Sequence, residues 1–255
     1  MTIATFGQSN SANSMTEKSD VAIPSNLYQY DWYSKSCYLY KEPLLGASGT
    51  RGNVITYTAV KMANISNKPI VIIPFGVGGT SVLEWAYRDL SHQHQIVMKR
   101  LKESGISPRI FLWHQGESDS IRKRISVSLD EITQVPYFET YFLYSRNRRV
   151  FPLTEDVYYN ALRKIVESTF KNFPQSSFGI ALATRCRNIP WNPVRIAQTR
   201  ISQDLPNTFI SADSDKITGL DKRPDNCHFS TKGASELGNL YYESIIKEIK
   251  NNIGT

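Results

Sequence analysis

Residues 109–119 read RIFLWHQGESD and combine an apolar run with a polar cluster directly after it. The run 109–114 is typical of a strand that is buried on both faces of a parallel sheet. Similar short apolar runs occur at 2–6 (TIATF), 69–75 (PIVIIPF), 177–184 (SFGIALAT) and 207–213 (NTFISAD). The sequence therefore predicts five strands.

Amphipathic stretches with helical spacing lie between these runs. The stretch 91–105 carries Ile96, Val97 and Leu101 and ends at Gly105, which is typical of a helix C-cap. Further helices are expected at 54–63, 155–173 and 232–249. Strands that alternate with helices predict one α/β domain over 1–255, a three-layer α/β/α sandwich with a mainly parallel five-stranded sheet.

The segment 120–153 departs from this pattern. It is rich in Arg, Tyr and Phe, contains the break Val135-Pro136 and lacks helical periodicity. We interpret it as an insertion that follows the strongest motif of the chain. Its basic residues, Arg122, Lys123, Arg124, Arg146, Arg148 and Arg149, lead to the hypothesis that it helps to hold an anionic glycan.

The composition narrows the class of protein. Among 255 residues, 40% are hydrophobic and 21% are charged, which excludes a disordered or fibrous chain. No apolar run approaches the roughly 18–20 residues of a transmembrane helix. A net charge of +7 favours anionic partners, but no nucleic-acid-binding motif is present, so neither nucleic acid nor a membrane is expected as a partner.

The cysteines and histidines predict no metal site. Cys37, Cys186 and Cys227 are too few and too scattered for a disulfide framework, and their odd number favours a reducing compartment. His92 and His94 are two residues apart, so they do not share a helical face, and no ligand set completes a zinc site. No signal peptide follows Met1, so the chain is expected to be cytoplasmic, or secreted if a leader has been removed.

Polar and glycine residues gather where the predicted strands end. In open α/β sheets, ligands bind beyond the carboxyl ends of the strands. The sequences at these places are GQSN at 7–10, GVGGTS at 76–81 and WHQGESD at 113–119, with DNCH at 225–228 ahead of the last helix.

These residues supply the parts of a serine esterase. Ser9 follows a glycine at a strand end and would act as a nucleophile if a base accepted its proton. Asp225 and His228 lie three residues apart, so a tight turn places the carboxylate against the imidazole. Candidate donors to an oxyanion are the Ser9 N–H, a glycine N–H and the Gln115 amide.

The blocks GQSN, GGTS with Trp85 after it, WHQGESD and Asp225-x-x-His228 resemble those of the SGNH hydrolase superfamily. More narrowly, they resemble the sialate O-acetylesterase-like carbohydrate acetylesterases, and the stretch 194–213 is similar to the family's segment before its last strand. The resemblance spans nearly the whole chain. It implies a flavodoxin-like SGNH hydrolase fold and an esterase that needs no metal or organic cofactor.

The resemblance also implies roles for single residues. Ser9 would be the nucleophile, His228 the general base and acid, and Asp225 the carboxylate that orients it. The oxyanion hole would consist of Ser9, Gln115 and a glycine, for which Gly52 is favoured and Gly46 and Gly49 stay open. The residues expected to contact substrate are Gln8, Asn10 and Trp113. Glu117 and Asp119 would hold the loop.

The expected activity is removal of O-acetyl groups from a carbohydrate through an acetyl-enzyme intermediate. An SGNH acyltransferase or a lipase-type esterase would use the same residues, so both remain alternatives. A nucleic-acid-binding module is a third alternative, but it gains nothing from Ser9 and His228. The sequence leaves the particular glycan and the oligomeric state open.

Overall fold

The computed structural model describes residues 1–120, 152–186 and 190–253. The predicted insertion at 120–153, with its six basic residues, lies outside the described residues except for Ser120, Pro152 and Leu153. The hypothesis about an anionic glycan therefore stays a prediction.

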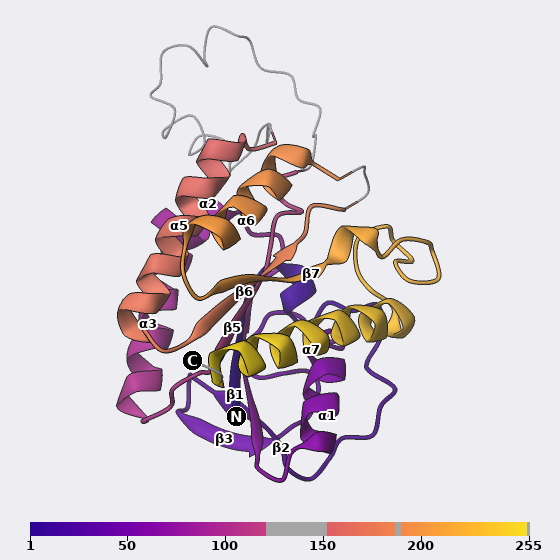
Figure 1. Cartoon of the computed structure of the whole chain (residues 1–255). Coiled ribbons are helices and arrows are strands. Elements are labelled where there is room, and N and C mark those ends of the chain that lie inside the picture. The colour runs from indigo at the N-terminus through magenta and orange to yellow at the C-terminus, as the bar shows by residue number, and fades with distance from the viewer. Residues whose placement is uncertain (121–151, 187–189, 254–255) are drawn as a thin grey trace, which may run out of the picture.

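The described strands form one seven-stranded sheet of order β3-β2-β4-β1-β5-β6-β7 (Figure 1). All neighbouring strands are parallel except β3, which pairs antiparallel with β2. The strands are β1 (Thr2–Gly7), β2 (Leu27–Asp31), β3 (Ser36–Leu39), β4 (Ile70–Gly76), β5 (Ile110–His114), β6 (Ser177–Leu182) and β7 (Thr208–Asp213). The predicted three-layer α/β fold is confirmed.

The number of strands is higher than predicted. All five predicted strands are present, and β2 and β3 are additional. The β3 sequence, SCYL, lacks a continuous apolar run because β3 lies at the sheet edge with most of its residues exposed, and the β2 sequence, LYQYD, is interrupted by the polar residues Gln29 and Asp31. A central parallel strand is covered on both faces and an edge strand is not, so the apolar signal that reveals the other strands is missing here.

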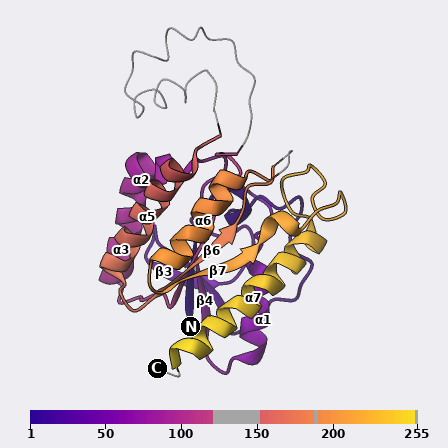
Figure 2. The ribbon, with the colours of Figure 1, turned by 45° about the horizontal axis from the view of Figure 1, so that its top comes forward.

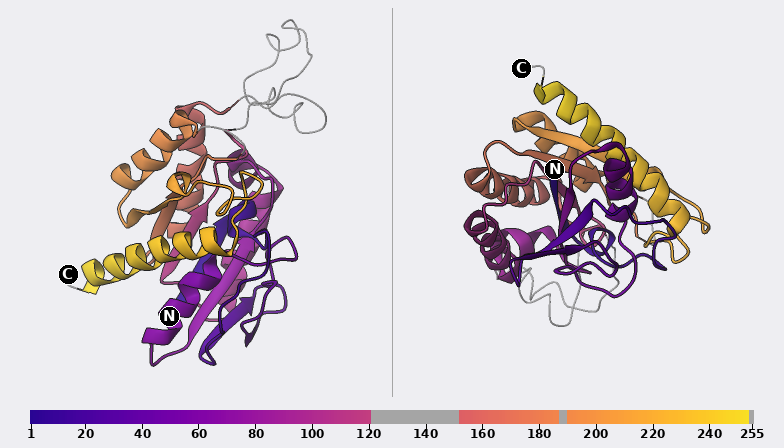
Figure 3. Two further views of the ribbon diagram at one scale, coloured as in Figure 1. Left: turned by 90° about the vertical axis from the view of Figure 1, so that its right-hand side faces the viewer. Right: turned by 90° about the horizontal axis from the view of Figure 1, so that it is seen from below.

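Helices cover both faces of the sheet (Figures 2 and 3). One core includes side chains of α2 (Val82–Tyr87), α3 (Asp89–Glu103), α5 (Glu155–Asn172) and α6 (Asn192–Asp204). The other core includes side chains of α1 (Ile55–Ile65) and α7 (Thr231–Ile253) on the opposite face. The four predicted helices correspond to α1, α3, α5 and α7, and α2 and α6 are additional.

Helix α3 ends just before the glycine that the sequence predicts as its C-cap, Gly105. Gly105 has φ +66°, and the N–H groups of Gly105 and Ile106 donate to the carbonyls of Lys102 and Leu101. This is the hydrogen-bond pattern of a Schellman motif, so the predicted C-cap at Gly105 is confirmed.

Strand register brings three candidate blocks together. Gly7, the last residue of β1, pairs with Gly76 at the end of β4 and with His114 at the end of β5. Phe6, one residue earlier, stacks on Phe111 and meets Phe75 edge-on. Packed aromatic rings therefore lie beneath the edge from which the polar blocks emerge.

Gly7 permits this close meeting of strands and predicts a stability effect. Its φ is +129°, and a Cβ there would lie 2.1 Å from the His114 carbonyl oxygen. Gly7→Ala should therefore lower the free energy of unfolding by about 3 kcal/mol or more, because both backbone strain and overpacking oppose it. Urea denaturation followed by circular dichroism measures the change.

Gly105→Ala is the matched control for this prediction. Gly105 also has a positive φ, +66°, but nothing lies within 4 Å of its Cβ position. This variant should lose only about 1–2 kcal/mol, the cost of the left-handed conformation alone. Equal losses in the two variants would contradict a steric role for Gly7.

Candidate active site

Ser9 lies in a short 3₁₀ helix, η1 (Ser9–Ser11), directly after β1. The Gln8 N–H donates to the His114 carbonyl at 3.0 Å, and the Ala12 N–H donates to the Ser9 carbonyl at 2.9 Å. The loop after β4 passes beside the serine, because a Cβ on Gly78 would lie 3.8 Å from the Ser9 Cβ. The backbone thus holds Ser9 at the carboxyl edge of the central strands.

Asp225 and His228 form the predicted pair on the loop 225–230, which precedes α7. Asp225 Oδ2 lies 2.7 Å from His228 Nδ1, and Asp225 Oδ1 accepts the backbone N–H groups of Cys227 and His228. Burial alone would raise the pKa of Asp225, but these hydrogen bonds outweigh burial and lower the pKa. The carboxylate is therefore ionised and orients the imidazole.

Three contacts place this loop next to the Ser9 turn. The Asn10 side-chain amide donates to the Cys227 carbonyl at 3.3 Å, and the Thr16 N–H donates to the Phe229 carbonyl at 2.9 Å. The Phe229 ring lies edge-on to His114, with centroids 6.2 Å apart. Among the described residues no hydrogen bond joins the Ser9 hydroxyl to His228, so proton transfer between them stays a prediction.

Cys186 and Cys227 form a disulfide, a single bond that was not predicted from the sequence. The two cysteines lie 41 residues apart in sequence, one after β6 and one between Asp225 and His228. Spacing could not reveal the pair, because only the sheet brings these loops to one edge. Among the described cysteines Cys37 alone is free, and it is exposed.

The guanidinium of Arg223 lies inside the same loop and is 2% exposed. It donates to the carbonyls of Ile217 at 2.9 Å, of Ser214 at 2.8 Å and of Cys227, and it lies 3.8 Å from the Phe229 ring centroid. Burial lowers the pKa of Arg223 to about 10, so the group stays charged at neutral pH. Backbone carbonyls thus replace the water that this charge has lost.

Gln115 is fully buried and already bonded. Its Nε2 lies 2.7 Å from Asp119 Oδ2, 3.1 Å from the Thr80 carbonyl and 3.3 Å from Gln8 Oε1. Both amide hydrogens therefore face acceptors inside the protein. In this arrangement Gln115 has no unused N–H to donate to an oxyanion, which is the role predicted for it.

Glu117 and Asp119 hold the loop, as predicted, and their environments differ. Burial alone would raise the pKa of Glu117, but the charge of His114 and hydrogen bonds from His114 and Asn10 lower it to about 2. Burial raises the pKa of Asp119 to about 6, although Ser81, the Val82 N–H and Gln115 donate to it. The Val82 N–H at the start of α2 lies 2.8 Å from Asp119 Oδ2, so this carboxyl group anchors the helix.

Gly52 does not contribute the predicted oxyanion donor, because its N–H donates to the Glu17 carbonyl at 3.0 Å. The alternatives Gly46 and Gly49 have Trp32 and Asn13 as their nearest neighbours. The glycines beside Ser9 belong instead to the loop after β4, since β4 is the neighbour of β1 in the sheet.

Two N–H groups of that loop differ in their partners. The Gly78 N–H donates to Ser48 Oγ at 2.8 Å. The Gly79 N–H has no hydrogen-bond acceptor among the described residues, and nothing lies within 4 Å of its Cβ position. The block GGTS, noted in the sequence, could have pointed to this loop.

The three residues predicted to contact substrate are buried in this structure. Gln8 is 2% exposed, Asn10 is 3% exposed and Trp113 is 0% exposed. Gln8 Oε1 accepts the Ser118 N–H at 2.9 Å, and the Trp113 ring meets Trp85 edge-on and donates to the Tyr158 hydroxyl. These side chains support the site from below.

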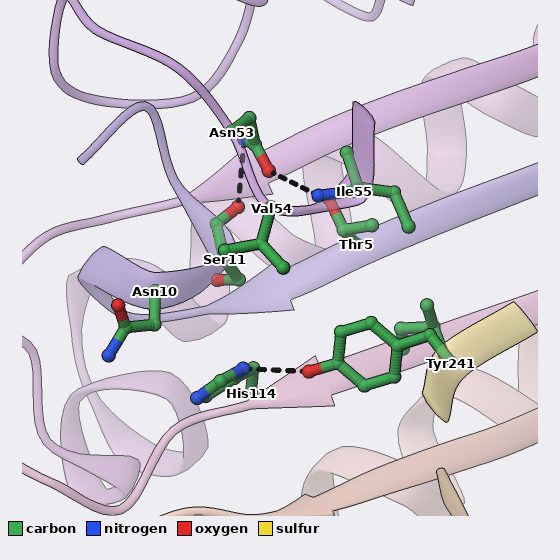
Figure 4. A pocket seen from close by; sticks show the side chains of 9 residues that line it. Thr5, Asn10, Ser11, Asn53, Val54, Ile55, His114 and Tyr241 are labelled. Atoms are coloured by element: carbon green, nitrogen blue, oxygen red, sulfur yellow. Dashed lines mark hydrogen bonds between the residues drawn. The ribbon is translucent and has the colours of Figure 1, made fainter. Parts of the chain in front are cut away.

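A cavity of about 10 Å³ lies beneath the Ser9 turn. Thr5, Asn10, His114 and Tyr241 are among its lining residues, and His114 hydrogen-bonds to the Tyr241 hydroxyl across it (Figure 4). The volume corresponds to about one water molecule. The cavity is therefore too small for a sugar.

The described residues contain neither a membrane-spanning helix nor a cluster of metal ligands. No helix in the described ranges is long and apolar enough to cross a membrane. No group of three or more His, Cys, Asp or Glu residues in those ranges could hold a metal ion. His94 packs edge-on against Phe6 in the core, and burial lowers the pKa of His94 to about 4.

Residues 6–131 match the family model described as carbohydrate esterase, sialic acid-specific acetylesterase. No curated protein matches the chain. Among solved structures the chain is similar to a protein from Arabidopsis thaliana, with 17% identity, a TM-score of 0.69, and coverage of 96% of this chain and 98% of that one.

Two further solved structures are similar to the chain. One is a carbohydrate acetylesterase from Xanthomonas citri, with 14% identity and a TM-score of 0.55, covering 94% of this chain and 54% of that one. The other is NanS, with 14% identity, a TM-score of 0.54, and coverage of 98% and 97%. At these identities the likeness concerns the fold.

The disulfide should stabilise the fold. Cys186→Ser with Cys227→Ser should lower the free energy of unfolding by about 2–4 kcal/mol, because the unfolded chain loses a cross-link over the 41-residue separation. Denaturant unfolding of the wild type with and without dithiothreitol should show the same loss. Cys37→Ser is the control and should change nothing, since that thiol is exposed and free.

Asp119 should make stability depend on pH. Its pKa is about 6 in the folded chain and 3.8 in its ordinary state, so its stabilising contribution is complete below pH 3.8 and is lost as the pH rises through 6. Relative to Asp119→Asn, the wild type should lose about 3 kcal/mol between pH 4 and pH 7. The free energy of unfolding is measured by urea denaturation at several pH values. If it changed with pH equally in the wild type and in Asp119→Asn, the prediction would be contradicted.

Proposed function

We propose that the chain, whose residues 6–131 match the sialic acid-specific acetylesterase family of carbohydrate esterases, is a carboxylic ester hydrolase in which Ser9, His228 and Asp225 remove O-acetyl groups from a carbohydrate. The observation that carries the proposal is the Asp225–His228 pair, 2.7 Å apart, on a loop that contacts the Ser9 turn. Asp225 Oδ2 accepts a hydrogen bond from the His228 Nδ1–H, which leaves Nε2 as the basic nitrogen.

The reaction proceeds in two halves. Ser9 Oγ attacks the acetyl carbonyl carbon while His228 Nε2 takes the hydroxyl proton. The tetrahedral intermediate collapses, the bond to the sugar oxygen breaks, and His228 returns the proton to that oxygen. Water then attacks the acetyl group on Ser9, His228 takes a proton from the water and returns it to Ser9 Oγ, and acetate leaves.

The oxyanion needs donors that are aimed at it and otherwise unused. The Ser9 N–H and the Gly79 N–H donate to no acceptor among the described residues, and both follow the carboxyl ends of neighbouring strands, β1 and β4, which makes them our candidates for these donors. Gly79 therefore takes the place in this proposal that the sequence gives to Gly52. Its open surroundings leave room for the acetyl group.

The Cys186–Cys227 disulfide supports the proposal that the protein acts in an oxidising compartment. Disulfides persist in such compartments and are rare where glutathione keeps thiols reduced. An oxidising compartment differs from the reducing compartment expected from the odd number of cysteines, an expectation that considered only that at least one thiol is free. Cys227 as part of a disulfide is also no candidate nucleophile.

Ser9→Ala should abolish turnover. Acetate release from an aryl acetate and from an acetylated glycan should fall by about 10⁴-fold or more, because the attacking oxygen is missing. The variant should unfold at the wild-type temperature. Ser11→Ala is the matched control, since Ser11 lies in the same turn but donates its hydroxyl to the Gln8 carbonyl. Wild-type turnover in Ser9→Ala would refute Ser9 as the nucleophile.

A further inference from the structure

A continuous set of buried hydrogen bonds runs from α7 to the Ser9 turn. The Tyr241 hydroxyl lies 2.7 Å from His114 Nδ1, and His114 Nε2 lies 3.2 Å from Glu117 Oε1. The same Glu117 oxygen accepts the Asn10 amide at 2.7 Å. The Asn10 nitrogen also donates to the Cys227 carbonyl at 3.3 Å, so the set ends on the loop that carries His228.

Asn10 is the residue at which three segments of the site meet. It follows Ser9 in η1, it contacts Glu117 in the loop after β5, and it contacts Cys227, which precedes His228. Its side chain is 3% exposed, so it has no surface to offer a sugar. The two hydrogens of its amide match the two acceptors that it faces.

We infer that Asn10 is a positioning residue that sets the separation of Ser9 and His228 by bridging the Glu117 carboxylate and the Cys227 carbonyl. The inference rests on the proposed function, because it takes Ser9 as the nucleophile and His228 as the base. Asn10 acts through these two neighbours and touches neither substrate nor the reacting atoms.

The Glu117 end of the bridge is firmly held. Glu117 is 1% exposed, and His114 donates from Nε2 to the same oxygen that Asn10 reaches. The hydroxyl of Tyr241 lies 2.7 Å from His114 Nδ1 and so holds the ring from its other side. Hydrogen bonds to an ionised carboxylate are about twice as strong as neutral ones.

The Cys227 end is held from its other side as well. Arg223 donates to the same carbonyl, and the disulfide ties Cys227 to the loop after β6. Neither contact reaches the Ser9 turn. The Asn10 side chain is therefore the contact that fixes the position of this rigid loop relative to η1. A shift of about 1 Å between reacting groups can lower the reaction rate by about 100-fold.

Asn10→Asp tests the inference with little change in volume. A carboxylate at this position can donate to neither acceptor, and it faces the carboxylate of Glu117. With an aryl acetate we expect kcat to fall by about 100-fold while KM stays within about twofold, because ground-state binding does not involve Asn10. Asn10→Ala should show the same split, which keeps the test valid if the carboxylate prevents folding.

A double variant separates positioning from stability. In Asn10→Asp with Glu117→Gln, an amide donor and a carboxylate acceptor again face each other, but residue 10 no longer donates to the Cys227 carbonyl, which keeps only its contact with Arg223. The unfolding temperature should recover towards the wild-type value, and kcat should stay low. Recovery of kcat together with the unfolding temperature would overturn the inference, since pairing with Glu117 would then be the whole role of Asn10.

Asn26→Asp is the matched control. The Asn26 amide also bridges two carbonyls, those of Ala63 and Ser66, each at 3.0 Å, but it lies at the amino end of β2. It should lower stability and leave kcat unchanged. If Ser9→Ala is inactive and folded Asn10→Asp or Asn10→Ala keeps wild-type kcat, the inference alone fails. If Ser9→Ala retains turnover, the proposed function fails.

Discussion

The parallel pairing of β1 with β4 on one side and β5 on the other is the constraint on which the site depends. Register places Gly7, Gly76 and His114 at one edge, where their backbones approach too closely for a side chain at Gly7. The Ser9 turn, the GGTS loop and the WHQGESD block must therefore emerge together. Without that register, these polar residues would be three unrelated loop sequences.

Close packing at this edge buries polar groups that then need partners. Gln8, Asn10, Gln115, Glu117 and Asp119 are all at most 3% exposed, and each has hydrogen-bond partners from another block. A buried polar group without a partner costs about 1–3 kcal/mol, so the loops are held in few arrangements. This rigidity is what a nucleophile and a base on separate segments require.

Several features of the fold and site could be predicted because their signals are local. Short apolar runs revealed β1, β4, β5, β6 and β7, and three-residue spacing revealed the Asp225–His228 pair. The strands β2 and β3 carry no such run. The surroundings of Gly52 and Trp113 could not be predicted because they depend on neighbours in space: the Gly52 N–H donates to the Glu17 carbonyl, and Trp113 lies in the core.

By itself, then, the sequence determined the α/β class, the strands with apolar runs and the polar blocks that follow them. These features depend on neighbouring residues, because a strand buried on both faces needs a run of apolar residues and a tight turn joins residues close in sequence. Only the tertiary structure decided which loop lies beside Ser9, that Cys186 pairs with Cys227, and that Asn10 faces inward. Each of these depends on segments far apart in the chain, whose meeting is set by strand order and register.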